Sequence, residues 1–295
     1  MSKILVLGSN GQVGKCLCEQ IDPKVNDVIS TSRDELDITN KNELYSIITK
    51  NKPNVIINAT GYTNVDLAED NHQEANELNN IAVSNVAKFS KEIGALFIHI
   101  STDYVFDGSS DIPYDEKSDT NPIGVYGKTK LLGENEIILS NCKYIILRTS
   151  WVFSEHGNNF LKTIIKLAEA KNQLKVIEDQ FGSPTYARDI ASTIISLIDY
   201  YKKNKLESEI IHFSGDKKCS WYFFAKSIVS SAKNFGLNVT EDISPINTED
   251  YLTKAKRPKN SVLSNLKINS KYNIKSSDWM AGVDKSIEFL IKENE

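Results

Sequence analysis

The segment Ile4-Leu5-Val6-Leu7-Gly8-Ser9-Asn10-Gly11-Gln12-Val13-Gly14 places a hydrophobic run directly before a glycine-rich turn. Glycines with the spacing G-x-x-G-x-x-G allow a tight turn between a strand and a helix, and they let the backbone approach a pyrophosphate closely. The positive N-terminal end of the following helix would hold that anion. Glycine-rich turns are also common without any ligand, so the turn needs support from the segments around it.

The first 150 residues alternate short β-branched runs with helical stretches, which is typical of a parallel sheet covered on both faces. The predicted strands are 3–8, 27–32, 54–60, 96–102, 143–149 and 174–178, and the predicted helices are 12–21, 41–50, 73–93 and 126–139. Because crossovers between parallel strands are right-handed, this order predicts an α/β fold with a Rossmann-type doubly wound sheet.

The second half is less regular. It predicts helices over 159–171, 221–235 and 278–292, a strand and a helix within 192–201, and loops over 254–264. We therefore expect residues 1–150 to form the dinucleotide-binding domain, with a segment of about 174–200 returning to it. Residues 151–295 are expected to form mainly a smaller C-terminal substrate-binding lobe.

The composition excludes several classes of protein. The chain has 295 residues and a net charge of −4, so it has no basic excess for binding nucleic acid. Its longest apolar runs, such as Ile4 to Leu7, are far below the ~20 residues of a membrane span, and the N-terminal run is too short for a signal peptide. The four cysteines are scattered and are expected to be incidental thiols. A cytoplasmic protein is expected.

The second predicted strand indicates which dinucleotide is bound. It ends in Thr31-Ser32-Arg33, where a site that prefers NAD places an acidic residue for the ribose 2′-hydroxyl. Ser32 and Arg33 suit a 2′-phosphate and favour NADP, although Arg33 as a solvated surface charge stays open. The other predicted cofactor residues follow strand ends or form the glycine turn: Gly8, Asn10, Gly11, Gln12, Val13, Gly14, Asp37, Ile38, Ala59, Thr60 and Tyr62.

A tyrosine and a lysine four residues apart form the predicted catalytic pair. Tyr126 and Lys130 would share one face of a helix, about 24 residues after a strand that ends at Thr102. A tyrosine pKa of ~10 is too high for proton exchange near neutrality, and a neighbouring ammonium lowers it. Such a pair also occurs by chance on exposed helices. Its order after the glycine turn and the Thr102 hydroxyl favours the catalytic interpretation.

In these motifs and their order, the chain resembles the extended short-chain dehydrogenase/reductases, and within them the dTDP-4-dehydrorhamnose reductase family. The strings that carry the resemblance are 11–14, 58–66, Ser101-Thr102-Asp103-Tyr104-Val105-Phe106, 126–130, Arg148-Thr149-Ser150-Trp151, Asp179-Gln180 with Gly182 and Pro184-Thr185, and Arg257-Pro258 with Ser261. The resemblance covers most of the chain.

The resemblance implies an oxidoreductase of dTDP-rhamnose biosynthesis, a route that supplies polysaccharides. The reaction would deliver hydride from NADPH, with use of NADH left open, to the C4 keto group of dTDP-6-deoxy-L-lyxo-4-hexulose and give dTDP-L-rhamnose. Tyr126 would donate the proton, and Lys130 would assist it and bind the nicotinamide ribose. Thr102 would hydrogen-bond the carbonyl, and Thr102 and Asp103 would touch the sugar. Trp151 would pack on the sugar ring, with core packing as its alternative.

The chain also departs from its family. Some members are dimers bridged by a metal between acidic side chains, whereas this chain has Cys16 and Arg188 where two of those acids would align. Neither suits a hard Mg²⁺ ion, so we expect no metal and a monomer or weak homodimer. Asn79 matches a supporting position, and His72, His99, His156 and His212 are expected to be structural.

Two other functions stay open. One is a reductase of another nucleotide-linked 4-keto deoxysugar, because pocket geometry sets that discrimination. The other is a non-catalytic NADP-binding regulatory subunit, which intact Thr102, Tyr126 and Lys130 disfavour.

Overall fold

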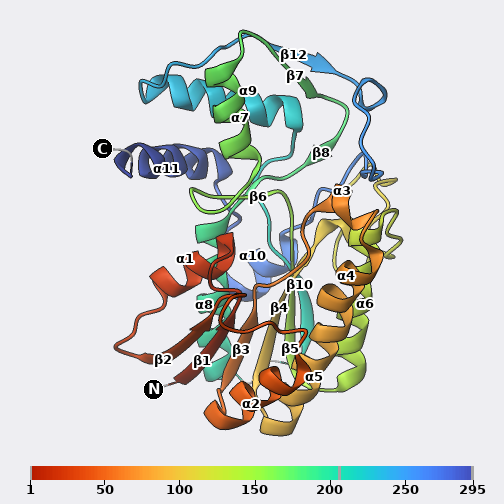
Figure 1. The fold of residues 1–295 in the computed structure, drawn as a ribbon, viewed down its shortest axis with the longest axis vertical. Coiled ribbons are helices and arrows are strands. Elements are labelled where there is room, and N and C mark those ends of the chain that lie inside the picture. The colour runs from red at the N-terminus through yellow and green to blue at the C-terminus, as the bar shows by residue number, and fades with distance from the viewer. Residues whose placement is uncertain (1, 205–206, 294–295) are drawn as a thin grey trace.

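The computed structural model describes residues 2–204 and 207–293 and contains a central sheet of six parallel strands (Figure 1). In spatial order the strands are β2 (Asn26–Thr31), β1 (Ser2–Leu7), β3 (Val55–Asn58), β4 (Leu96–Thr102), β5 (Lys143–Thr149) and β10 (Glu209–His212). The strand order reverses between β1 and β3, which is where ligands bind in open sheets of this kind. The predicted α/β, Rossmann-type fold is confirmed.

Helices cover both faces of the sheet. On one face, α1 (Gln12–Gln20) and α8 (Ala187–Asn204) bury their apolar sides against the strands. In α8, Ile190, Ile194 and Leu197 recur at helical spacing and are fully buried in this core. The opposite face is covered by α2 (Lys41–Asn51), α5 (Ala82–Ile93) and α6 (Val125–Ser140). A sheet buried on both faces explains the nearly continuous apolar strands.

The predicted helix over 73–93 is interrupted in the structure. It consists of α4 (His72–Asn76), a π-helical turn η1 (Glu77–Ile81) and then α5, after the short helix α3 (Val65–Ala68). A π turn inserts an extra residue into a helix and is frequent at functional sites. Here it brings the buried Asn79 to face α6.

The rest of the chain forms a smaller lobe above the carboxyl ends of the strands (Figure 1). Its core lies between α7 (Phe160–Ala170), α9 (Trp221–Asn234) and α11 (Trp279–Lys292), with Trp279 and Phe224 fully buried. The remaining elements are η2 (Asp103–Val105), β6 (Val152–Phe153), β7 (Leu174–Ile177), β8 (Phe181–Gly182), β9 (Thr185–Tyr186), β11 (Cys219–Ser220), β12 (Ile243–Ile246), η3 (Thr248–Asp250) and α10 (Leu266–Tyr272).

Two predictions in the second half were wrong. The strand over 174–178 does not join the central sheet, because β7 pairs in parallel with β12 inside the lobe. The sixth sheet strand is instead β10, which pairs with β5. The segment 192–201 contains no strand, since it lies entirely within α8. In that segment β-branched residues locally resemble a strand, but their helical spacing determines the structure.

The return of the chain to the central domain is therefore made by α8 and β10. The loop predicted over 254–264 is confirmed. In the parts of the chain that the structure describes, no helix is both long enough and apolar enough to cross a membrane.

Candidate active site

A cavity of about 880 Å³ lies between the carboxyl edge of the sheet and the smaller lobe. Of the predicted site residues, those that line it are Gly8, Asn10, Gly11, Gln12, Val13, Arg33, Asp37, Ile38, Ala59, Thr60, Tyr62, Thr102, Asp103, Tyr126, Lys130 and Trp151. The structure therefore brings the glycine turn, the Tyr126–Lys130 pair and Trp151 to one space. Gly14 and Ser32 do not line it.

The glycine turn has the geometry that its sequence predicts. Gly8 has a φ of +85°, a left-handed conformation that favours glycine. A Cβ on Gly14 would lie 2.1 Å from the Gly8 carbonyl oxygen, so this glycine allows α1 to start close against the strand. Gly14 therefore lies behind the residues that line the cavity, where it allows close packing of α1 against the turn. Gln12 connects the turn to the lobe, because its Oε1 accepts hydrogen bonds from Asn159 Nδ2 at 2.9 Å and Ser154 Oγ at 3.1 Å.

Ser32 and Arg33 have different positions. Both the backbone N–H and the hydroxyl of Ser32 donate to Glu35 Oε2, at 2.8 and 2.9 Å. Ser32 is buried, and its hydroxyl is already engaged. Arg33 and Asp37 are exposed and line the cavity, so the side chain that faces a ligand at the end of β2 is the guanidinium.

Tyr126, Thr102 and Asp103 lie together at the inner end of the cavity. Burial raises the pKa of Tyr126 to about 12, whereas a hydrogen bond with Thr102 acts to lower it and the Asp103 charge to raise it. Burial also raises the pKa of Asp103 to about 7. Thr102 Oγ1 donates to Asp103 Oδ1 at 3.0 Å, and Asp103 Oδ2 is buried without a hydrogen-bond partner. Asp103 therefore has an acceptor available for a ligand hydroxyl.

Lys130 is almost fully buried and faces β4. Its Nζ donates to the Ile100 carbonyl oxygen at 2.7 Å and lies 3.1 Å from His99 Nε2. Burial lowers the pKa of Lys130 to about 8, and the charge of Glu134 opposes this.

Close packing positions α6 and its catalytic residues. A Cβ on Gly127 would lie 2.1 Å from the Tyr104 carbonyl oxygen, and one on Gly133 would lie 2.2 Å from the Asn79 carbonyl oxygen. A buried ion pair adds to this: Arg148 Nη2 lies 2.6 Å from Glu134 Oε2. The same carboxylate accepts a hydrogen bond from Ser101 Oγ at 2.5 Å. The helix, β4 and β5 are thereby fixed to one another.

Asn79 supports the site without lining it. Its Oδ1 accepts from the Tyr62 N–H at 2.8 Å, and its Nδ2 donates to Thr129 Oγ1 at 3.1 Å. It therefore connects the loop after β3 to α6.

Two tryptophans form a stack in the wall of the cavity. Trp151 and Trp221 lie with ring centroids 3.4 Å apart and ring planes at 4°. Trp151 has a φ of +46°, and a Cβ on Gly182 would lie 2.3 Å from its ring, so this glycine leaves room for the indole. Trp151 packs against the core of the lobe and also lines the cavity.

Sequence reasoning did not identify several cavity residues. They include Tyr104, Asn158, Asn159, Trp221 and Arg257. Arg257 is in a quoted string of the resemblance, which could have assigned it, and it forms an ion pair with Asp66 at 2.7 Å. Trp221 and Asn159 come from the lobe, and no local pattern in the sequence places them next to the sheet.

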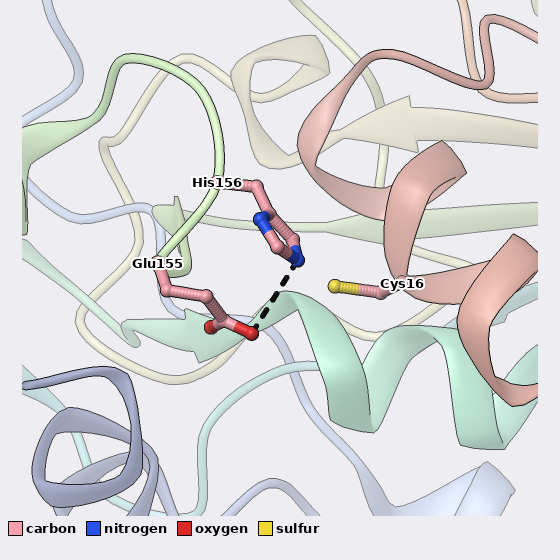
Figure 2. Close-up of side chains that lie close together, drawn as sticks. All are labelled: Cys16, Glu155 and His156. Carbon is pink, nitrogen blue, oxygen red and sulfur yellow. Dashed lines mark ion pairs between the residues drawn. The ribbon is translucent and has the colours of Figure 1, made fainter. Parts of the chain in front are cut away.

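Cys16, Glu155 and His156 lie close together outside the cavity (Figure 2). His156 Nε2 is 3.5 Å from Glu155 Oε1. Arg188 already pairs with Glu155 Oε1 at 2.5 Å and with Glu19 Oε2 at 2.7 Å. Burial raises the pKa of the Cys16 thiol to about 12. Both carboxylates are therefore already paired with one guanidinium, and the thiol does not offer the oxygen ligand that Mg²⁺ prefers.

Comparisons with known proteins give a consistent result. A model of the family described as the RmlD substrate binding domain matches residues 2–291. A dTDP-4-dehydrorhamnose reductase of Aggregatibacter actinomycetemcomitans is 42% identical over 284 residues, covering 95% of this chain and 96% of its own. The crystal structure of a Bacillus anthracis dTDP-4-dehydrorhamnose reductase in complex with NADP has a TM-score of 0.91 and 35% identity, covering 98% of this chain and 99% of its own. A Clostridium acetobutylicum structure of the same name has a TM-score of 0.91 and 38% identity over the same shares.

Proposed function

Because the chain belongs to the RmlD substrate-binding-domain family, we propose that it is an NADPH-dependent dTDP-4-dehydrorhamnose reductase. It reduces the C4 keto group of dTDP-6-deoxy-L-lyxo-4-hexulose to give dTDP-L-rhamnose. The main support for this function is that a single cavity is lined by the glycine turn, the Tyr126–Lys130 pair and the tryptophan stack.

The residues present fit a dinucleotide. Gly8 and Gly11 expose backbone at the start of α1, where a pyrophosphate is stabilised by the helix N-terminus. Arg33 is an exposed cation at the end of β2, suited to a 2′-phosphate. NADP in the Bacillus anthracis relative supports the same assignment. When bound, this cofactor supplies the hydride.

Protein side chains supply the proton and orient the keto sugar. Tyr126 carries its proton at neutral pH, because burial keeps its pKa at about 12, and is thus ready to donate to an oxyanion at C4. Thr102 lies beside it and hydrogen-bonds the same oxygen. Asp103, with its unpartnered Oδ2, accepts from a sugar hydroxyl. Trp151 presents an aromatic face to the hexose.

A turnover assay tests this function. The purified chain is given NADPH and a panel of dTDP- and UDP-linked 4-keto sugars. We expect the dTDP-linked L-lyxo sugar to be reduced with the highest kcat/KM. Preference for a different sugar would replace the substrate assignment, and NADPH binding without any reduction would identify a regulatory subunit.

Cofactor choice gives a first prediction. We expect NADPH to be used at least as efficiently as NADH, and Arg33→Ala to raise KM for NADPH about tenfold, because a charge-assisted hydrogen bond contributes roughly 1.5–3 kcal/mol and this one is solvent-exposed. KM for NADH should change little. Steady-state kinetics with both cofactors measure this. A tenfold preference of the wild type for NADH would show that Arg33 holds no phosphate.

The tryptophan stack gives a second prediction. Trp151→Ala should lower kcat/KM for the keto sugar about 10–100-fold, because it removes stacking area from the wall of the cavity. Binding of NADPH, measured by fluorescence titration, should stay within twofold. Trp151→Phe keeps an aromatic face and should restore most of the activity. Unchanged turnover in Trp151→Ala would remove Trp151 from the sugar site.

Assembly gives a third prediction, and here we propose a monomer or weak homodimer that does not depend on Mg²⁺. Arg188 pairs with both Glu19 and Glu155, so a guanidinium stands where a hard cation would have to bind, and Cys16 adds no oxygen ligand. Sedimentation should give the same mass with Mg²⁺ and with a chelator. A dimer that dissociates on chelation would contradict the prediction.

A further inference from the structure

His99 lies behind the Tyr126–Lys130 pair, in the middle of the sheet. Its side chain is fully buried on β4, next to Asn58 on the neighbouring strand β3. Burial and the Lys130 charge hold the pKa of His99 well below its ordinary value. The imidazole is therefore neutral, and only one of its two ring nitrogens carries a hydrogen. Which nitrogen that is determines how His99 interacts with Lys130.

Asn58 determines which ring nitrogen of His99 carries the hydrogen. The Asn58 amide oxygen accepts from the Thr60 backbone N–H at 3.0 Å and from the Thr60 hydroxyl at 2.6 Å. A backbone N–H can only donate, so the amide oxygen must face Thr60 and the amide nitrogen must face His99. That nitrogen, Nδ2, lies 3.2 Å from His99 Nδ1. Because Nδ2 is a donor, Nδ1 is the acceptor, and the hydrogen of the imidazole is on Nε2.

The Nε2–H then faces Lys130. The Nε2–Nζ distance is 3.1 Å, within hydrogen-bond range. An ammonium is a donor only, so a charged Lys130 would place two donors against each other inside the protein. An uncharged amine has a lone pair that accepts from Nε2–H, while one of its own hydrogens still bonds the Ile100 carbonyl at 2.7 Å. The series of hydrogen bonds that starts at Thr60 is satisfied throughout only with the amine.

The other charged groups around Lys130 do not reverse the preference for the uncharged amine. Titratable side chains on the elements packed around it include Tyr126 and Glu134 of α6, Asp103 and Tyr104 after β4, Glu77 of η1 and Arg148 of β5. The helices that pack against α6 add Asp66 of α3, His72 and Glu74 of α4, and Lys88, Lys91 and Glu92 of α5, and α6 itself adds Lys128 and Glu136. Of these, only the charge of Glu134 acts on the pKa of Lys130, which it raises. Glu134 is itself paired with Arg148. Burial outweighs it and lowers the pKa of Lys130 to about 8.

We propose that His99 is a positioning residue for Lys130: its hydrogen on Nε2 favours the uncharged amine, so that Lys130 can exchange a proton with the site instead of staying a permanent cation. This inference rests on the proposed function, because it concerns the lysine that accompanies the proton donor Tyr126. It assigns a role to a histidine that the sequence left as structural, and to Asn58 and Thr60 as the groups that fix its tautomer.

The tautomer can be observed directly by NMR. In full-length protein labelled with ¹⁵N-histidine, the His99 signals are assigned by their loss in His99→Gln. We expect Nδ1 to have the shift of an unprotonated ring nitrogen and Nε2 that of a protonated one, from about pH 6 to 9. The variant serves only to assign the signals, and the tautomer itself is observed in the wild type. A hydrogen on Nδ1, or an imidazolium at neutral pH, would overturn the proposal.

The charge of Lys130 is followed in protein labelled with ¹³Cε-lysine, with Lys130→Arg for assignment. In the wild type we expect Lys130 to titrate near pH 8. In His99→Gln the side-chain carbonyl can turn to Lys130 and accept from an ammonium, so the midpoint should move toward the ordinary ~10.4. The matched control is His156→Gln, which replaces another buried histidine outside the cavity, away from Glu134 and Arg148, and should leave the midpoint unchanged.

A Lys130 that titrates above about pH 10 in the wild type, or equal midpoints in wild type and His99→Gln, would refute the role of His99. Both readouts use the protein without substrate, so they separate this inference from the proposed function. If no keto sugar is reduced while both signals behave as expected, the function fails and the inference stands. If the sugar is reduced but His99 carries its hydrogen on Nδ1, the proposed function stands and the inference about His99 fails.

Discussion

Tyr126→Phe should lower kcat for the keto sugar by about 10²–10⁴-fold, the contribution typical of a positioned general acid. This corresponds to roughly 3–5 kcal/mol of barrier. The substitution removes only a hydroxyl. The ring keeps its edge-to-face contact with Tyr104, at a centroid distance of 5.8 Å, so the fold should be unchanged. The affinity for NADPH should stay within a few-fold. Steady-state kinetics and NADPH titration measure the two effects.

The matched control is Tyr186→Phe. Tyr186 is also buried, but its hydroxyl donates to Glu155 outside the cavity. It should lose little activity. If Tyr126→Phe kept near-full activity, the proton would come from another group, and Asp103, whose pKa burial raises to about 7, would be the first to examine.

Arg148→Met should destabilise the protein by about 3–5 kcal/mol, because it leaves a buried carboxylate without its cation. Glu134 and Arg148 have side chains only 1% and 3% exposed, so water cannot replace the lost partner. The expected result is a large drop of the thermal midpoint and of the urea midpoint. The measurement is denaturation of the full chain, followed by circular dichroism.

A double substitution separates the charge from the packing. Arg148→Met combined with Glu134→Leu removes both charges and should recover part of the lost stability, since an apolar pair can replace a buried ion pair at little cost. Arg33→Met, at an exposed position, should change stability by less than about 0.5 kcal/mol. A double variant no more stable than Arg148→Met would show that the position of α6, rather than the unpaired charge, limits stability.

The sequence predicted the first five sheet strands, and nearly all of its predicted site residues line the cavity, because both depend on local patterns. A glycine turn, a strand that ends at Thr102 and a tyrosine four residues before a lysine each depend on neighbours in the chain. The carboxyl ends of parallel strands then bring them to one edge. The strand β10 was missed, since only its pairing with β5 identifies four residues as a strand of the sheet.

Other features could not be predicted because they depend on contacts between distant segments. His99 in the sequence is a lone histidine within an apolar run. The role inferred for it depends on its contacts with Asn58 and Lys130, which lie 41 and 31 residues away. The Trp221 contribution depends on α9 of the lobe reaching the ring of Trp151. The π turn places Asn79 against the loop after β3. The spacing of hydrophobic residues in the sequence does not indicate such a turn.

The left-handed backbone of Trp151 has an evolutionary consequence. A bulky side chain at a φ of +46° costs about 1–2 kcal/mol that a glycine at the same position would not. The ring offsets this cost, because it stacks on Trp221 and packs against the core of the lobe. The strained backbone is therefore tolerated only while the indole has these surfaces to pack on. A lineage that loses Trp221 should also tend to lose Trp151.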